Sequence, residues 1–194
     1  MSQADLREVA RRAVREEVLR QAWLLFADQG FDATTVDEVA AAAGMSRRTF
    51  FRYFSGKDEL VLARLVEAGE QIAEALAARP EDETPWQALR RAFDSVLEAQ
   101  EAQPDRARTV SRMLRDEASA RASMEERRRV WLETLVPLVQ QRLPRRKDAA
   151  IAAEALASAA IACLDTAQAA WTEGGADRMA AALDAAMGAV GPLG

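Results

Sequence analysis

The stretch that decides the fold is TVDEVAAAAGMSRRTFFRYF, residues 35–54. Thr35 is a favourable N-cap residue, and Glu38 three positions later can return its carboxylate to the Thr35 amide, which completes a capping box. Apolar residues then recur at spacings of three and four, so they share one face of a first short helix. Gly44 suits the left-handed residue that ends many helices. The stretch therefore begins as a short capped helix that ends in a tight turn.

A second helix is predicted from Arg47 to Tyr53, with Ser46 as its N-cap. Two short helices joined by a turn that contains glycine form a helix-turn-helix, and in DNA-binding proteins the second helix lies in the major groove. Residues 46–54 include three arginines and no acidic residue. Arginine pairs bidentately with guanine, threonine contacts a thymine methyl or a phosphate, and tyrosine hydroxyls reach phosphates. The pattern favours a DNA-reading helix, and an ordinary helical corner with solvated arginines is the alternative.

The composition of the 194-residue chain favours an all-α globular protein. Hydrophobic residues make up 49% of it, which argues against disorder, and alanine is abundant while β-branched residues are sparse. The net charge is −5, so DNA affinity would require local basic clusters. Residues 1–54 carry eight arginines against eight acidic residues and are neutral, so residues 55–194 carry the whole negative charge.

Two scarce residue types limit the classes of function that the chain can have. There is no histidine, the commonest general base and metal ligand, and Cys163 is the only cysteine, which suits a reducing cytoplasm. No signal peptide is expected, and no membrane span is expected because the most apolar stretch, residues 149–164, still contains Glu154. Neither an enzyme nor a cofactor or metal site is predicted, because the neighbouring acid pairs fit solvated helix faces; these pairs are Asp116-Glu117 and Glu125-Glu126.

Apolar stripes and helix breakers predict about nine helices: three in a small N-terminal unit, one that links, and five in a larger C-terminal unit. The linking helix is expected over residues 56–79. The next helix starts at Thr84-Pro85, a capping residue followed by proline at the first helical position, and is expected to run to about Gln100. Asp177 is expected to cap the last helix.

Several short motifs surround the opening stretch. They are the corner Gln29-Gly30-Phe31, the Thr35 helix with Val39-Ala40, the turn Gly44-Met45-Ser46, the ending Phe51-Arg52-Tyr53-Phe54 and the start Lys57-Asp58-Glu59-Leu60. Together they make the run FADQGFDATTVDEVAAAAGMSRRTFFRYFSGKDEL, residues 26–60, which resembles the N-terminal domain of TetR-family transcriptional regulators. The resemblance implies a helix-turn-helix DNA-binding domain at residues 1–55 and a helical effector-binding and dimerisation domain at residues 56–194.

The resemblance also implies DNA contacts for matching residues. Thr35 would touch a phosphate, and Tyr53 and Lys57 would bind phosphates, with Lys57 helped by a helix N-terminus. Phe51 stands where the family often has tyrosine, so only an apolar contact with a thymine methyl is expected there. Asp37 is interpreted as a helix-dipole partner that points away from the DNA. The predicted DNA-binding residues are Thr35, Ser46, Arg47, Arg48, Thr49, Phe51, Arg52, Tyr53 and Lys57.

The partners that the resemblance implies are a double-stranded DNA operator, a small-molecule effector and a second copy of the chain. Family members are usually homodimers whose last two helices form a four-helix bundle, which the alanine-rich helices Ala149–Trp171 and Arg178–Val190 fit. Effector binding would shift the linking helix, so that the two recognition helices no longer match major-groove turns about 34 Å apart. Repression is the family's usual mode.

The effector is expected to be apolar or amphipathic, since a chain with no histidine and one tyrosine offers few polar groups to a pocket. A fatty acyl compound and an aromatic natural product would both fit. Two alternatives stay open: the pocket candidates are plain core residues, and the protein is a helical-bundle interaction module without sequence-specific DNA binding. The candidate pocket residues are Trp86, Phe93, Met113, Trp131, Leu135 and Thr166.

Overall fold

The structure, a computed structural model, describes residues 3–145 and 147–193, and every regular element in these ranges is a helix. The N-terminal part holds α1 (Gln3–Gln29), α2 (Val36–Ala42) and α3 (Arg47–Phe50), and α4 (Lys57–Ala77) leads out of it. The C-terminal part is built from α5 (Pro85–Ala92), α6 (Asp94–Glu101), α7 (Pro104–Asp116), α8 (Ala118–Gln141), α9 (Ala149–Thr172) and α10 (Met179–Val190). The predicted all-α fold class, a helix-turn-helix domain followed by a helical domain, is confirmed.

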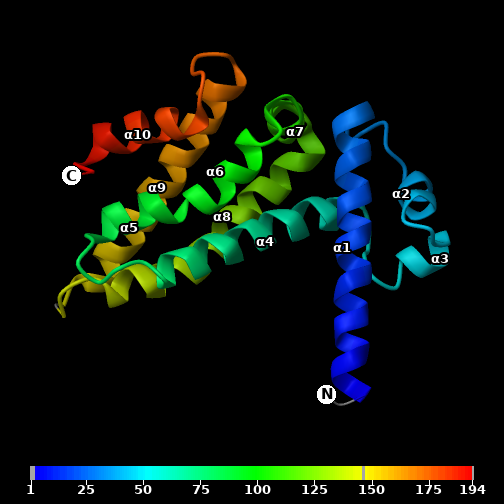
Figure 1. Cartoon of the computed structure of the whole chain (residues 1–194), viewed down its shortest axis with the longest axis horizontal. Helices are drawn as coiled ribbons and strands as arrows, with labels where there is room; N and C mark the ends of the chain where they lie inside the picture. The colour runs from blue at the N-terminus through cyan, green and yellow to red at the C-terminus, as the bar shows by residue number, and fades with distance from the viewer. Residues whose placement is uncertain (1–2, 146, 194) are drawn as a thin grey trace.

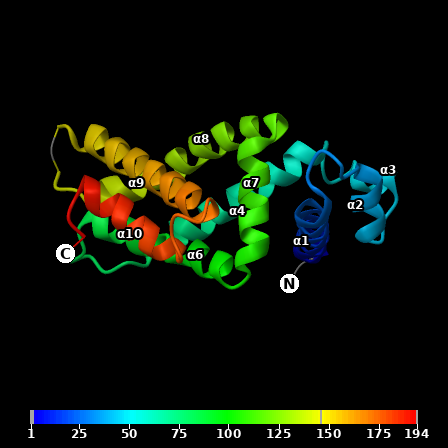
Figure 2. The ribbon, with the colours of Figure 1, turned by 90° about the horizontal axis from the view of Figure 1, so that it is seen from above.

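The helix-turn-helix lies at one end of the molecule. α2 and α3 lie on the outer side of α1, away from the C-terminal helices (Figure 1, Figure 2). α4 runs from this end back through the molecule and packs along α8, and α9 and α10 lie at the opposite end (Figure 1). α4 therefore extends from the helix-turn-helix into the C-terminal part.

Two hydrophobic clusters hold the helices together. One joins α4, α5, α8, α9 and α10 around fully buried residues such as Leu89 and Ile161. The other packs Phe26, Phe50 and Phe54 around the helix-turn-helix, and it also takes in residues of α4, α7 and α8, namely Leu60, Val61, Met113, Leu114 and Ala120. Because this N-terminal core extends past residue 55, the division into residues 1–55 and 56–194 stays a proposal.

Two helix boundaries differ from the sequence-based expectation. The helix expected from Thr84 to Gln100 is divided at the fully buried Phe93, so ten helices are described where about nine were expected. The start of α10 is capped by Glu101 of α6 instead of Asp177, because the Glu101 carboxylate accepts the Ala180 amide N–H at 3.1 Å. The cap of the last helix thus comes from a distant element, which local sequence rules do not detect.

α9 is the one described helix that is long and apolar enough to cross a membrane by length and composition, where the sequence predicted no span. Of its most apolar window 39% is buried, and the helix packs against α8 and α10. Core helices of folded domains pass the same test, so this carries little weight for a membrane location. The exposed face of α9 carries mostly small side chains; its residues are Ile151, Ala155, Ala162 and Thr166.

Candidate nucleic-acid interface and effector cavity

The two helices of the helix-turn-helix are fixed by the caps that the sequence predicts. The Thr35 amide donates to the Glu38 carboxylate at 2.7 Å, and the Glu38 amide donates to the Thr35 hydroxyl at 3.2 Å. The backbone hydrogen bond from Thr35 is the largest cause that lowers the pKa of Glu38 below its ordinary value. Gly44 has φ 68°, the left-handed region expected of the turn, and Ser46 accepts the Thr49 amide at 3.2 Å. α3 is thereby held at a defined angle to α2.

The three arginines around α3 have different surroundings. Arg48 and Arg52 are exposed and form no hydrogen bond or ion pair with any residue that the structure describes. Arg47 instead pairs with Asp37 of α2 at 3.0 Å and stacks 5.5 Å from the centroid of Phe51. The expectation that Asp37 points away is therefore wrong, since the tight turn brings the starts of α2 and α3 close enough for an ion pair.

The remaining predicted DNA-binding residues lie on the same corner. The Thr49 hydroxyl shares a 2.9 Å hydrogen bond with the Ser46 hydroxyl, and Phe51 is 46% exposed. Tyr53 is half-buried, and its carbonyl accepts from Arg15 at 2.5 Å. Lys57 donates to the Phe31 carbonyl at 2.6 Å, which fixes the loop between α1 and α2. The DNA contacts themselves stay predictions.

The six predicted effector residues are not gathered around one of the cavities described below. Four of them are buried in the C-terminal cluster, Met113 belongs to the N-terminal cluster, and Thr166 is exposed with its hydroxyl donating to the Ala162 carbonyl of its own helix. Trp131 has a clear packing role, because its indole N–H donates to the Leu65 carbonyl at 2.8 Å. The other three in the C-terminal cluster are Trp86, Phe93 and Leu135.

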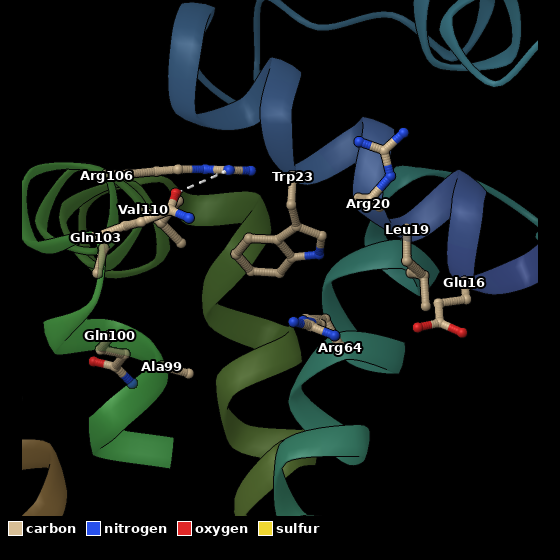
Figure 3. Close-up of a pocket in the computed structure, with 11 residues that line it drawn as sticks. Glu16, Leu19, Arg20, Trp23, Arg64, Ala99, Gln100, Gln103, Arg106 and Val110 are labelled. Atoms are coloured by element: carbon tan, nitrogen blue, oxygen red, sulfur yellow. Dashed lines mark hydrogen bonds between the residues drawn. The ribbon is translucent and has the colours of Figure 1, made fainter. Parts of the chain in front are cut away.

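A cavity opens where α1 meets α4, α6 and α7, and we call it the seam cavity (Figure 3). Its outer lobe has a volume of about 410 Å³ and its inner lobe about 190 Å³. Three arginines and one acid lie at the outer lobe, Arg20, Arg64, Arg106 and Glu16, and two of the arginines, Arg20 and Arg64, pair with the nearby Glu17 and Glu67. The residues common to both lobes are Trp23, Arg64, Ala99, Gln100, Ala107 and Val110.

Two polar atoms of the seam cavity lack a partner. The indole nitrogen of Trp23 and the side-chain oxygen of Gln100 are buried and form no hydrogen bond within the described residues. Unpartnered buried polar groups are uncommon and unfavourable, and because neighbouring side chains shield both atoms, a bound molecule would reach them only after those side chains move. Sequence reasoning missed both residues; the available signal was a tryptophan beside the polar face of α1, following Glu16 and Arg20.

The C-terminal helices also contact the helix-turn-helix directly. Glu117, at the corner between α7 and α8, accepts the Phe31 amide N–H at 3.3 Å. Its second carboxylate oxygen is buried without a partner among the described residues. Lys57 holds the carbonyl of the same Phe31 residue. The loop that positions α2 is therefore held from α4 and from the α7–α8 corner.

Comparison with known families identifies two matching regions. Residues 18–63 match the family model described as bacterial regulatory proteins, tetR family, and residues 83–192, more than half of the chain, match the model described as MftR C-terminal domain. The HTH-type transcriptional regulator TcmR of Streptomyces glaucescens is 40% identical over 92 residues, 47% of this chain. The match spans 41% of the length of TcmR.

Solved structures show the same fold over nearly the whole chain. The TetR-family repressor FadR of Thermus thermophilus, solved with lauroyl-CoA, is 27% identical with a TM-score of 0.56 and covers 89% of this chain and 91% of its own. The regulator FadR of Bacillus subtilis, solved with stearoyl-CoA, has a TM-score of 0.65 at 15% identity, covering 92% of this chain and 98% of its own. At the latter identity the similarity shows the fold alone.

Proposed function

Because the chain belongs to the tetR family of bacterial regulatory proteins, we propose that it is a cytoplasmic, ligand-responsive repressor that binds a DNA operator as a homodimer. The observation that carries the proposal is the pair of exposed arginines, Arg48 and Arg52, which have no partner in the described chain and lie on a capped helix-turn-helix. Their guanidinium groups are free to meet base edges or phosphates without first breaking an internal ion pair.

An electrophoretic mobility shift with the DNA that flanks the protein's own gene tests this function. Arg48→Ala is expected to weaken binding by about 1–3 kcal/mol, and Tyr53→Phe to weaken it through loss of a phosphate contact. Arg145→Ala, in the exposed turn between α8 and α9, is the matched control and should bind as wild type does. Wild-type protein that prefers this DNA no more than a random duplex at about 100 mM salt would contradict the proposal.

The proposed dimer uses the uncovered faces of α9 and α10. Exposed alanines on both helices, among them Ala155 and Ala162 on α9 and Ala181 and Ala185 on α10, allow close approach of a second pair of helices. A stable interface of this kind buries about 800 Å² per partner. Sedimentation should show a dimer that Ala162→Glu dissociates and Ala102→Glu, exposed between α6 and α7, does not. A monomeric wild-type protein would exclude the dimer.

The proposed effector is amphipathic and occupies the seam cavity. The acyl-CoA ligands of the two FadR structures support this class, and a side-chain movement on binding would let the unpartnered atoms of Trp23 and Gln100 bond a polar group. A ligand wedged between α1 and α4 would change the angle at which α4 presents the helix-turn-helix, with a coupling of about 1–3 kcal/mol.

Release of operator DNA by lauroyl-CoA tests the effector site. Trp23→Phe keeps the ring but removes the N–H donor, so it should weaken release while leaving DNA affinity unchanged. Trp171→Phe, buried in the C-terminal cluster, is the matched control and should respond as wild type does. If Trp23→Phe and wild type respond identically, the ligand does not use this indole.

A further inference from the structure

A second cavity lies on the other side of α7 from the seam cavity, between α7, α8 and α9, and we call it the rear cavity. Its volume is about 330 Å³. Its apolar wall is formed by Leu114, Met124 and Ala169. The inner lobe of the seam cavity and the rear cavity have Ser111, Leu114 and Gln168 in common, so the two spaces adjoin at these side chains.

One hydrogen bond between two side chains crosses the boundary between the two cavities. The Gln168 amide group of α9 donates to the Ser111 hydroxyl of α7 at 2.7 Å. Both groups are neutral, and such a pair contributes modestly to stability, so rotation of the Gln168 side chain would cost little and would widen the contact between the cavities beside Leu114. Gln168 is also the single amide in an otherwise apolar run, Ala167-Gln168-Ala169, which core packing of an alanine-rich helix does not require.

The two cavities differ in whether the polar side chains around them have hydrogen-bond partners. Trp23 and Gln100, which line the seam cavity, each have a buried polar atom without a partner among the described residues. The polar side chains of the rear cavity, in contrast, already have partners and leave an apolar interior. They are Arg115, Asp165 and Thr172, bonded to Glu173 at 2.9 Å, Arg127 at 2.7 Å and the Gln168 carbonyl at 2.6 Å.

We propose that the rear cavity binds the apolar end of an extended ligand whose polar end lies in the seam cavity, and that the Ser111–Gln168 pair limits the ligand's length. This rests on the proposed effector role of the seam cavity. The inner lobe, at about 190 Å³, is smaller than the roughly 300 Å³ at which small-molecule sites begin, so a ligand whose polar end fills the outer lobe needs the rear cavity to place a long apolar end. Apolar burial in the rear cavity favours the opened arrangement.

Calorimetric titration of the full chain with straight-chain alkanoates of increasing length tests the proposal. These probes share one carboxylate head and differ only in apolar length. Gln168→Ala removes the partition and should bind the longest probes about tenfold more tightly than wild type, with no change for the shortest. Ala169→Phe fills the rear cavity and should bind the longest probes about tenfold more weakly, again with no change for the shortest.

Gln140→Ala, exposed on α8 outside both cavities, is the matched control and should show the wild-type length profile. Ala169→Phe that binds the longest alkanoate as tightly as wild type would show that the rear cavity is not used. An unchanged length profile in Gln168→Ala would remove the partition role. Wild-type protein that shifts operator DNA but binds no alkanoate would overturn the rear-cavity proposal and leave the regulator function standing.

Discussion

At the scale of single residues, neighbouring arginines on α3 differ although the sequence treats them alike. Arg47 is held by Asp37, whereas Arg48 has no partner in the described chain. Both members of the Arg47–Asp37 pair are more than half exposed, and exposed ion pairs contribute about 0–1 kcal/mol, so DNA can displace Asp37 easily. Asp37 therefore reduces the positive charge near α3, but it does not prevent Arg47 from contacting DNA.

Asp37→Asn is expected to strengthen DNA binding. The change removes a negative charge beside the phosphates and frees Arg47, so binding to random DNA should gain as well as binding to the operator. Dissociation constants measured over a range of salt concentrations should show a steeper salt dependence. Asp82→Asn, exposed between α4 and α5, should change neither quantity. Weaker binding by Asp37→Asn would mean that the carboxylate positions Arg47 for contact.

At the scale of elements, the crossing of α4 and α8 depends on one glycine. A Cβ atom at Gly69 would lie 2.4 Å from ring atoms of Trp131, closer than real Cβ contacts. The Trp131 indole is held against α4 by its hydrogen bond to the Leu65 carbonyl, one turn before Gly69. Gly69 is thus needed for close approach, and Trp131 acts as a packing residue of this crossing.

Gly69→Ala is expected to lower the free energy of unfolding by about 1–3 kcal/mol, because the added methyl overpacks the crossing. Urea denaturation gives this quantity. The decisive comparison is a double-mutant cycle, in which the cost of Gly69→Ala should shrink in a Trp131→Leu background that has room for the methyl. Equal costs in both backgrounds would show that the indole is not the source of the strain.

A second element-scale contact joins α6 to α10 and depends on pH. The Ala180 amide hydrogen bond is the largest cause that lowers the pKa of Glu101, and Arg178 lowers it further. A carboxylate whose pKa is lower in the folded chain stabilises it above the unfolded value, about 4.3, and this stabilisation is lost as pH falls through the lowered value.

Glu101→Gln should therefore be less stable than wild type near neutral pH. The difference should narrow as the pH falls below about 4.3, because wild-type Glu101 then becomes protonated as well. Thermal unfolding at several pH values measures this. Glu98→Gln, exposed on the same helix, is the control expected to change little. A difference that is constant with pH would assign the effect to packing instead of charge.

At the scale of the whole molecule, two hydrogen-bonded contacts add to the hydrophobic packing that joins the helix-turn-helix to the C-terminal part. One is α4, through Lys57, and the other is Glu117 at the α7–α8 corner, which bonds the amide of Phe31. α7 separates the seam cavity from the rear cavity, so a ligand that moves α7 also moves Glu117. Effector binding can therefore move the helix-turn-helix through the Glu117 contact as well as through α4.

Glu117→Ala is expected to weaken the response to effector more than it weakens DNA binding. Loss of this contact should lower the coupling by about 0.5–2 kcal/mol, seen as a smaller ratio of operator dissociation constants with and without lauroyl-CoA. Glu117→Gln keeps an acceptor oxygen and should retain most of the response. Asp116→Ala, the exposed neighbour, is the control, and an unchanged ratio in Glu117→Ala would show that coupling runs through α4.

The sequence by itself determined the helix-turn-helix and the all-α fold. Thr35, Glu38, Gly44 and Ser46 act within four residues of their partners, so their roles follow from spacing, and the family resemblance extends that local pattern to a regulator. Short-range capping and helical periodicity do not depend on how distant elements pack.

Only the tertiary structure decided the cavities, the Asp37–Arg47 pair and the capping of α10 by Glu101. Trp23, Gln100, Ser111 and Gln168 come from four different helices, and their proximity depends on how α1, α6, α7 and α9 cross. Large aromatic residues were the natural sequence candidates for a pocket, but such side chains fill the core because they bury the most apolar area. The space that remains open is lined by side chains of mixed type from several helices, and their sequence context gives no distance information.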